Sequence, residues 1–286
     1  MAEVKTIAVM GAGIMGRGIA HAAALGGYRT ILQDKFPEAL KKAEGEIRAN
    51  LDKAVDLQKV SAAEAETAFR KIEYTSSVAD AARDADLVIE AVPEEMPAKI
   101  EIFTECDRVS GAETILASNT SSLSITEIAS VTTRPAKCVG MHFFNPVHKM
   151  KLVEIVRALE TSDDTIAIAA EVGQRMKKET VVIKESAGFI TSRINAMIGN
   201  EAFYMLQEGV ASAADIDKAL KLGLNHPMGP FELVDLVGLD TRLHILEYLH
   251  HSLGDKYRPC PLIAQYVKAG RLGRKTGRGV YEYPQK

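Results

Sequence analysis

The N-terminal two thirds of the chain alternates short apolar runs with stretches of helical periodicity. The apolar runs are typical of buried strands, and they lie at residues 4–10, 28–33, 86–92, 114–118 and 180–183. Helical periodicity or capping residues predict helices between them, at residues 19–25, 95–109, 125–129 and 162–177. Because this alternation is typical of parallel sheets covered by helices, we expect an α/β fold.

A helical hairpin is predicted directly after the second strand, over residues 36–72. Pro37 begins a helix whose apolar positions recur every 3 or 4 residues, at Leu40, Ala43, Ile47, Leu51 and Ala54. A capping box, Ser61-x-x-Glu64, begins a second helix that continues to about Lys71. The outer face of the hairpin is basic, as solvated helix faces often are, with Lys41, Lys42, Arg48, Lys53 and Lys59.

Two further apolar runs, at residues 138–144 and 151–156, are joined by only the six residues 145–150. This connection is too short for a helical crossover, so we expect the two strands to pair antiparallel. If the connection is centred near His148, residues 142 and 154 face each other, and these are His142 and Glu154. A carboxylate beside an imidazole fixes its tautomer, so the pair is a candidate general base with its orienting partner. A structural pair in the core is an equally good interpretation of these two residues alone.

The pattern changes after Gly188, where helical stretches replace the alternation. A long apolar helix is predicted over residues 189–208, Ser212 caps another that ends at Gly223, and further helices follow at 229–253 and 260–269. Strand-like alternation returns only at 280–283. We therefore expect two domains, 1–186 and an all-α domain 187–286. Because the helix at 189–208 is too apolar for a monomer surface, we expect a homodimer formed through the C-terminal helices.

Composition excludes several classes of protein. The 286 residues carry 35 Lys and Arg against 38 Asp and Glu, and the net charge of −3 provides no basic field for a nucleic acid. The cysteines, Cys106, Cys138 and Cys260, are not spaced as a metal site or a redox pair. No apolar run is long enough for a membrane span, and Arg17 and His21 interrupt the N-terminal stretch where a signal peptide would be continuous. We expect a cytoplasmic protein with no metal and no nucleic-acid or membrane partner.

A glycine-rich turn separates the first strand from the first helix. It reads Gly11-Ala12-Gly13-Ile14-Met15-Gly16, and Asp34 ends the second strand 18 residues after Gly16. In this context Gly11 permits the tight turn, Gly13 admits a pyrophosphate, and Gly16 lets the helix pack close to the strand. The turn therefore predicts a dinucleotide site. Asp34 would accept hydrogen bonds from ribose hydroxyls and repel a 2′-phosphate, which favours NAD over NADP, although Lys35 beside it would soften the repulsion.

Small polar side chains gather just after the strand at 114–118. Residues 117–122 read Ala-Ser-Asn-Thr-Ser-Ser. Because ligands of parallel α/β sheets bind beyond the carboxyl ends of the strands, substrate contacts are expected here, while a turn that caps the next helix explains only some of these residues. Glu94 and Lys99 follow the preceding strand, where they either reach a cofactor ribose or are solvated.

Six segments spread over the chain are distinctive in combination. They are VMGAGIMGRGIA (9–20), DLVIEAVPE (86–94), ASNTSSLSITEIA (117–129), GMHFFNPVHKMKLVEIV (140–156), NHPMGPFELVDLVGLD (225–240) and GRKTGRGVYEY (273–283). With them the chain resembles the 3-hydroxyacyl-CoA dehydrogenase family, and within it the bacterial 3-hydroxybutyryl-CoA dehydrogenases. The resemblance implies a Rossmann-type NAD-binding domain, a helical C-terminal domain, and hydride transfer between NAD and C3 of a short-chain acyl-CoA.

The resemblance also implies roles for individual residues. His142 matches the catalytic base, Glu154 its orienting partner, and Ser121 a serine beside the substrate oxygen and the nicotinamide. Cofactor contacts are implied for Gly11, Gly13, Ile14, Met15, Gly16, Asp34, Glu94, Lys99, Ser121, Asn145 and Lys275. The hairpin matches an arm that holds CoA, which would involve Asn50 and Lys53.

One position departs from the family pattern. The family has an asparagine that contacts the substrate carbonyl in a GF-x-x-N-R segment, and Ser192 stands there in this chain. A serine still donates one hydrogen bond, but it is shorter and has no amide. We therefore expect the hydride chemistry to persist and the orientation of the substrate to differ, with Asn195 as a candidate substitute one helical turn further on.

Two other interpretations stay open. A two-domain dehydrogenase that acts on a free hydroxy acid would not need the arm at 36–72, and such enzymes tend to use a lysine as base. A non-catalytic NAD-binding relative would not need the set of Ser121, His142 and Glu154.

Overall fold

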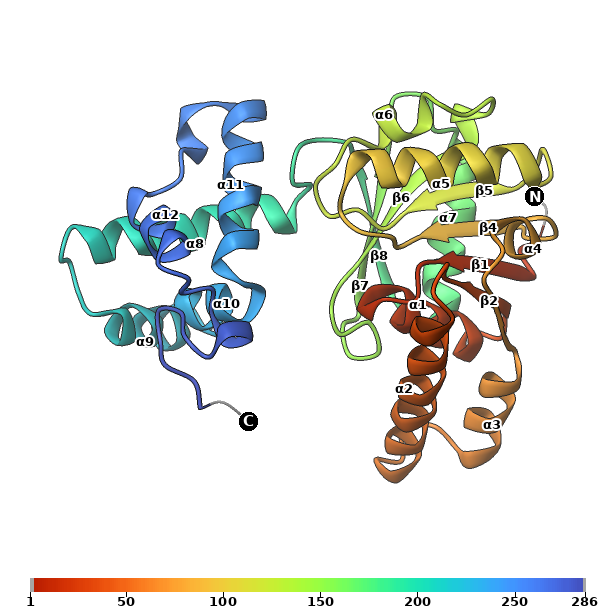
Figure 1. Cartoon of the computed structure of the whole chain (residues 1–286), viewed down its shortest axis with the longest axis horizontal. Helices are drawn as coiled ribbons and strands as arrows, with labels where there is room; N and C mark the ends of the chain where they lie inside the picture. The colour runs from red at the N-terminus through yellow and green to blue at the C-terminus, as the bar shows by residue number, and fades with distance from the viewer. Residues whose placement is uncertain (1–2, 285–286) are drawn as a thin grey trace. The chain divides into compact units, whose positions relative to one another are not determined.

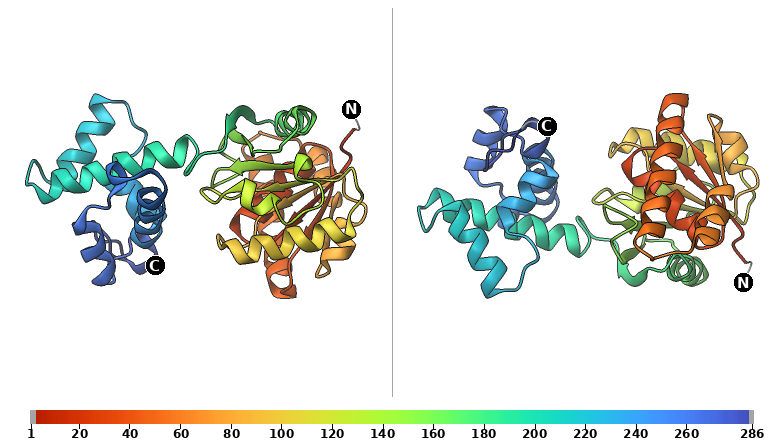
Figure 2. Two further views of the ribbon diagram at one scale, coloured as in Figure 1. Left: turned by 90° about the horizontal axis from the view of Figure 1, so that it is seen from above. Right: turned by 90° about the horizontal axis from the view of Figure 1, so that it is seen from below.

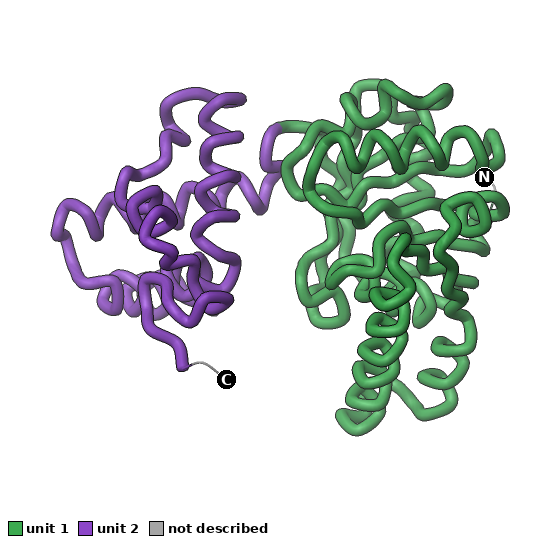
Figure 3. Tube along the Cα trace, in the orientation of Figure 1, with its two compact units in different colours: residues 1–186 green, residues 187–286 purple. Residues whose placement is uncertain are grey.

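The computed structural model describes residues 3–284. The chain divides into two compact units, residues 1–186 and 187–286, which are coloured separately in Figure 3. The division coincides with the domain boundary that the sequence suggests. Each unit has its own apolar core, so each is described by itself.

The first unit is built on one sheet of eight strands in the order β3-β2-β1-β4-β5-β6-β7-β8. Only β6 and β7 pair antiparallel, and the other neighbours are parallel. The order from β3 to β6 is that of the Rossmann-type fold, whose ligands bind where the strand order reverses, here between β1 and β4. The strands are β1 (Thr6–Met10), β2 (Arg29–Gln33), β3 (Ile72–Thr75), β4 (Leu87–Glu90), β5 (Ile115–Ser118), β6 (Cys138–Phe143), β7 (Leu152–Arg157) and β8 (Glu179–Lys184).

Helices cover both faces of this sheet, because strand residues alternate between two apolar clusters. Ile7 and Val9 of β1 pack with one set of helices, and Ala8 and Met10 pack with the other. The first set is α1 (Ile14–Leu25), α2 (Pro37–Asp56), α3 (Ala62–Arg70) and α7 (Asp163–Arg175), and the second is α4 (Val78–Ala82), α5 (Met96–Val109) and α6 (Ile125–Ala129). Yellow α5 and green α7 lie on opposite sides of the sheet in Figure 2.

The predicted hairpin is present as α2 and α3, which project together below the sheet in Figure 1. The expected apolar stripe is buried, from Leu40 and Ala43 to Ile47 and Leu51. The expected capping box is also present, since Ser61 accepts from the backbone of Glu64 and the Glu64 carboxylate accepts from the backbone of Ser61. The hairpin is therefore a packed part of the first unit.

Sequence analysis missed the two elements that follow the hairpin, β3 and α4. Strand β3 has only 4 residues and only Ile72 is buried, because it is an edge strand. Helix α4 has 5 residues. Elements this short contain too few apolar positions to show a periodicity.

The second unit is helical, with α8 (Thr191–Gln207), α9 (Ala213–Gly223), α10 (Pro230–Val237), α11 (Leu239–Leu253) and α12 (Pro261–Lys268). The helical segment expected over 229–253 is present, divided into the two helices α10 and α11. Gly238 lies between them as the C-cap of α10 and the N-cap of α11. Its φ of 106° is a backbone conformation that only glycine adopts without strain.

The strand expected at 280–283 is wrong. Within the described part of the second unit, this segment makes only an isolated bridge between Arg278 and Glu282. Its backbone is held instead by the buried carboxylate of Asp235, which accepts from the N–H groups of Val280 and Tyr281 at 2.8 and 2.9 Å. The alternation of Val280 and its neighbours reflects this docking rather than a sheet.

In the described part of the chain, no helix combines the length and the apolar character needed to cross a membrane. Among the same residues, no group of three or more His, Cys, Asp or Glu side chains is arranged to hold a metal ion.

Candidate active site

The glycine turn follows β1 and leads into α1, and its geometry explains each glycine. A Cβ on Gly11, whose φ is 99°, would lie 2.7 Å from the carbonyl oxygen of Ala91, and one on Gly16 would lie 1.6 Å from that of Gly11. A Cβ on Gly13 would meet nothing within 4 Å. Gly11 and Gly16 are therefore required by packing, whereas Gly13 keeps open the space in front of the helix.

That space suits an anionic group. Gly13 is the N-cap of α1 and has no side chain to occupy the N–H groups of the first turn. A helix N-terminus also carries a partial positive charge, and together these features bind phosphates. Ile14 is 59% exposed at the same end of the helix, and Met15 is half-buried.

Asp34 ties the end of β2 to this turn. Its Oδ2 accepts from the N–H of Ala12 at 2.8 Å, and its Oδ1 accepts from the N–H of Phe36 at 3.0 Å. A carboxylate has about four acceptor positions, so two remain for ribose hydroxyls. The glycine turn and Asp34 together fit the adenosine and pyrophosphate of NAD.

The expected strand register is confirmed, because β6 and β7 pair His142 opposite Glu154. The imidazole Nδ1 lies 2.7 Å from Glu154 Oε2, and both side chains are buried, at 6% and 1% exposure. An ionised carboxylate only accepts, so Nδ1 carries the hydrogen of this bond. In the neutral imidazole Nε2 then has the lone pair, which is the arrangement of a general base.

The polar loop after β5 is organised by Glu94. Glu94 Oε1 accepts from Thr120 Oγ1 at 2.6 Å, from the N–H of Ser121 at 2.8 Å and from Ser121 Oγ at 3.2 Å. Burial opposes ionisation of Glu94, but the charge of Lys99 and these hydrogen bonds outweigh it and lower the pKa of Glu94. Glu94 is therefore ionised, and its carboxylate holds Thr120 and Ser121 by hydrogen bonds.

The side chain of Lys99 points into the protein. The interpretation that Lys99 is solvated is therefore wrong. Its side chain is 1% exposed, and its Nζ lies 2.8 Å from Glu90 Oε1 and 3.1 Å from Glu94 Oε2. Glu90 stands at the same strand end in the sequence and was given no role there, although a glutamate at the end of the apolar run DLVIE is itself a signal that a partner is near. Whether Lys99 touches the cofactor stays a prediction.

The connection between β6 and β7 places Asn145 just beyond the carboxyl end of β6. Asn145 is exposed, and the buried amine of Lys178 fixes the rest of the connection by donating to the carbonyl oxygens of Val147 and Met150. Asn119 joins this region to the polar loop, because its Oδ1 accepts from the N–H of Phe143 at 2.9 Å. The candidate base and Ser121 thus lie on directly connected segments.

A basic cluster lies between this connection and the arm. Burial lowers the pKa of His148, and the positive charges of Lys149, Lys178, Lys59 and Lys53 lower it further. Lys53 and Lys59, at the end of α2 and just beyond it, are thereby placed near His148. Asn50, on the same helix, is half-buried.

The two remaining predicted residues belong to the second unit. Ser192 is half-buried in the first turn of α8. Lys275 donates to both carboxylate oxygens of Asp240, at 2.6 and 2.7 Å. Their roles toward substrate and cofactor stay predictions.

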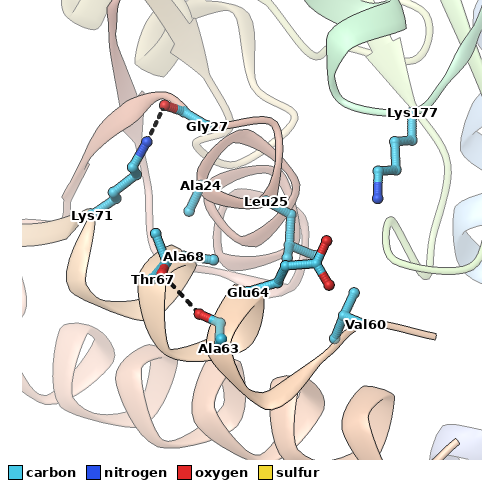
Figure 4. Close-up of a pocket in the computed structure, with 10 residues that line it drawn as sticks. All are labelled: Ala24, Leu25, Gly27, Val60, Ala63, Glu64, Thr67, Ala68, Lys71 and Lys177. Atoms are coloured by element: carbon cyan, nitrogen blue, oxygen red, sulfur yellow. Dashed lines mark hydrogen bonds between the residues drawn. The ribbon is translucent and has the colours of Figure 1, made fainter. Parts of the chain in front are cut away.

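A separate pocket of about 270 Å³ lies at the other end of α1 (Figure 4). Ala24, Leu25 and Gly27 line it together with residues of α3, and Lys71 there donates to the carbonyl oxygen of Gly27. No predicted site residue lines it. Basic side chains at a helix C-terminus stabilise the helix, which accounts for Lys71 without a ligand.

These features define the class of the protein, an NAD-dependent dehydrogenase on a Rossmann-type sheet. Residues 6–186 match the family model of the 3-hydroxyacyl-CoA dehydrogenase NAD-binding domain, and residues 188–283 match that of the C-terminal domain. The chain belongs to the 3-hydroxyacyl-CoA dehydrogenase family.

Individual relatives are similar over nearly their whole length. A probable 3-hydroxybutyryl-CoA dehydrogenase of Bacillus subtilis is 47% identical and covers 99% of both chains. A 3-hydroxybutyryl-CoA dehydrogenase of Bradyrhizobium diazoefficiens is 46% identical over 99% of this chain and 96% of its own. The crystal structure of an (S)-3-hydroxybutyryl-CoA dehydrogenase from Ralstonia eutropha matches with a TM-score of 0.96 and 43% identity, covering 99% of this chain and 100% of its own.

Proposed function

We propose that the protein oxidises short-chain (3S)-3-hydroxyacyl-CoA, such as 3-hydroxybutyryl-CoA, reversibly to the 3-ketoacyl-CoA with NAD. The observation that carries the proposal is the buried pair of His142 and Glu154, 2.7 Å apart, in the same unit as a glycine turn that fits NAD. The first unit therefore holds both the cofactor and the base.

Bound NAD supplies the acceptor for the hydride that leaves C3. His142 takes the hydroxyl proton at Nε2, and Glu154 holds the ring by Nδ1 and stabilises the imidazolium that forms. Glu94 holds the backbone N–H of Ser121, and the Ser121 hydroxyl turns from Glu94 to donate to the substrate oxygen. Asn145 and Glu94 would contact the bound cofactor, and Ser192 would take the place of the family asparagine at the substrate carbonyl.

The basic cluster supports a CoA thioester over a free hydroxy acid. CoA carries phosphates, whereas a small free acid has no group that extends to the arm. Lys53, Lys59 and Lys149 gather around His148 and form a basic patch that suits such phosphates.

The test is to assay NADH oxidation with acetoacetyl-CoA and with free acetoacetate, over a series of 3-ketoacyl-CoA chain lengths. We expect a strong preference for the short CoA esters, and NADH to be preferred over NADPH. Equal rates with free acetoacetate would contradict the CoA assignment.

We also infer that the protein is a cytoplasmic homodimer. The apolar side chains of Ile190, the N-cap of α8, and of Ile194 and Met197 within α8 are 48%, 55% and 38% exposed, and their spacing puts them on one helix face. Burying this face against a second copy would remove apolar surface from water. Light scattering with Ile194→Glu tests it, and an unchanged dimer in that variant would refute this interface.

A further inference from the structure

A closed ring of hydrogen bonds lies at the carboxyl ends of β4 and β5. Glu90, the last residue of β4, accepts from Ser118 Oγ at 2.6 Å and from Lys99 Nζ at 2.8 Å. Lys99 Nζ also lies 3.1 Å from Glu94 Oε2, and Glu94 Oε1 accepts from Thr120 Oγ1 at 2.6 Å. The N–H of Thr120 donates to Ser118 Oγ at 3.2 Å, which closes the ring.

The ring contains two charged groups, Glu90 and Lys99, that are almost completely buried. Glu90 is 0% and Lys99 1% exposed, and Ser118 and Thr120 are 0% exposed. Removing a carboxylate and an ammonium from water costs several kcal/mol per ion, and well-packed apolar residues often serve stability as well. A buried pair of this kind is therefore better explained by what it holds in place than by stability.

The ring holds the polar loop after β5. Glu94 uses the oxygen that accepts from Thr120 to accept also from the N–H and Oγ of Ser121. Glu94 lies just before α5, and its side chain is half-exposed, so it needs partners to hold it. Lys99 is the cation that fixes Glu94 Oε2. Glu90 in turn fixes Lys99, and it also fixes Ser118, the last residue of β5 before the loop begins.

We propose that Glu90 is a positioning residue that acts through Lys99 and Ser118 to fix Glu94, which in turn orients Ser121 toward the substrate. The role of Ser121 at the substrate is that of the proposed function, so the inference rests on it. Lys99 accordingly acts on the cofactor site through Glu94.

The test compares Glu90→Gln with Glu95→Gln, the same change at an exposed neighbour. In Glu90→Gln the side chain keeps its shape but loses the charge that holds Lys99. We expect kcat for acetoacetyl-CoA reduction to fall at least about tenfold in Glu90→Gln, since small displacements of reacting groups cost that much or more. Glu95→Gln should match the wild type.

A double-mutant cycle distinguishes positioning from a general structural effect. Adding Glu90→Gln to Glu94→Gln should lower kcat by no more than about threefold, because Glu90 then has no Glu94 carboxylate to fix. Effects that multiply, or a Glu90→Gln enzyme with wild-type kcat, would overturn the proposal. The dissociation constant for NADH is measured for the same single and double variants. Because this measurement needs no acyl-CoA, it tests Glu90 even if the proposed substrate is wrong.

A second variant covers the case in which Glu90→Gln does not fold. Ser118→Ala removes the hydrogen bond from Ser118 Oγ to Glu90 and leaves the ion pairs of Lys99 intact. It should lower kcat at least about threefold, and it too should add little to Glu94→Gln. Wild-type kcat in Ser118→Ala, or full additivity with Glu94→Gln, would overturn the proposal.

Discussion

Replacing Glu154 with glutamine isolates the charge behind His142 from the shape of its surroundings. The two side chains are 2.7 Å apart and nearly inaccessible to solvent, so their hydrogen bond is charge-assisted and weakly screened. The glutamine amide has nearly the same volume but no charge. It can also turn its NH₂ toward Nδ1, which would place the imidazole hydrogen on Nε2 and block the base.

The magnitude follows from the energy of such a bond. Hydrogen bonds to charged groups contribute about 1.5–3 kcal/mol, and the imidazolium that forms during the reaction depends on this one fully. If that energy is lost only in the transition state, kcat falls about 10- to 150-fold. Turning of the amide would add to this loss.

The assay is steady-state NADH oxidation with acetoacetyl-CoA, together with the dissociation constant for NADH and a thermal melt. The glycine turn and Asp34 are untouched, so NADH binding should stay within about threefold of wild type. Glu160→Gln, an exposed glutamate just beyond β7, is the matched control. A kcat within about twofold of wild type in folded Glu154→Gln would refute the role given to the pair.

Four further predictions concern other parts of the chain. His142→Gln should lower kcat at least about 10²-fold with NADH binding intact, which fluorescence titration and kinetics measure together. Gly16→Ala should abolish NADH binding or folding because its Cβ would lie 1.6 Å from a carbonyl oxygen, whereas Gly45→Ala, in open space on α2, should raise the melting temperature. Ser192→Asn should change KM or chain-length preference more than the affinity for NADH, and a change in NADH affinity alone would contradict its placement. Burial lowers the pKa of His21 to about 4, so the unfolded chain binds a proton below pH 6.5 that the folded chain refuses; stability should fall by about 2 kcal/mol by pH 5, and His21→Gln should remove that part of the acid dependence.

The near-zero net charge illustrates how local charge differs from its average. The balance of 35 basic and 38 acidic residues excludes a nucleic-acid surface, but it says nothing about anionic ligands of smaller size. Around His148 the tertiary structure gathers lysines from the arm and from the β6–β7 connection. A patch of this kind has no signature in the sequence, since its members are about 100 residues apart.

Local signals were sufficient where one short segment sets the geometry. The glycine turn, the capping box at Ser61 and the β6–β7 register follow from spacing within a few residues, because backbone sterics and a short connection leave few alternatives. Short elements without such signals, β3 and α4, were missed, and the helical segment 229–253 was predicted without the break at Gly238. In these places a glycine or an edge position in the fold decides the outcome.

The sequence by itself determined the dinucleotide turn and the partnership of His142 with Glu154, since each depends on neighbours along the chain. Only the tertiary structure decided the direction of Lys99. On an isolated helix its amine would be solvated, but packing of α5 against the sheet places it between two carboxylates, where burial makes pairing obligatory. The cost of leaving a buried charge unpaired is a property of the folded environment, and for that reason the ring around Glu90 could not be read from the chain.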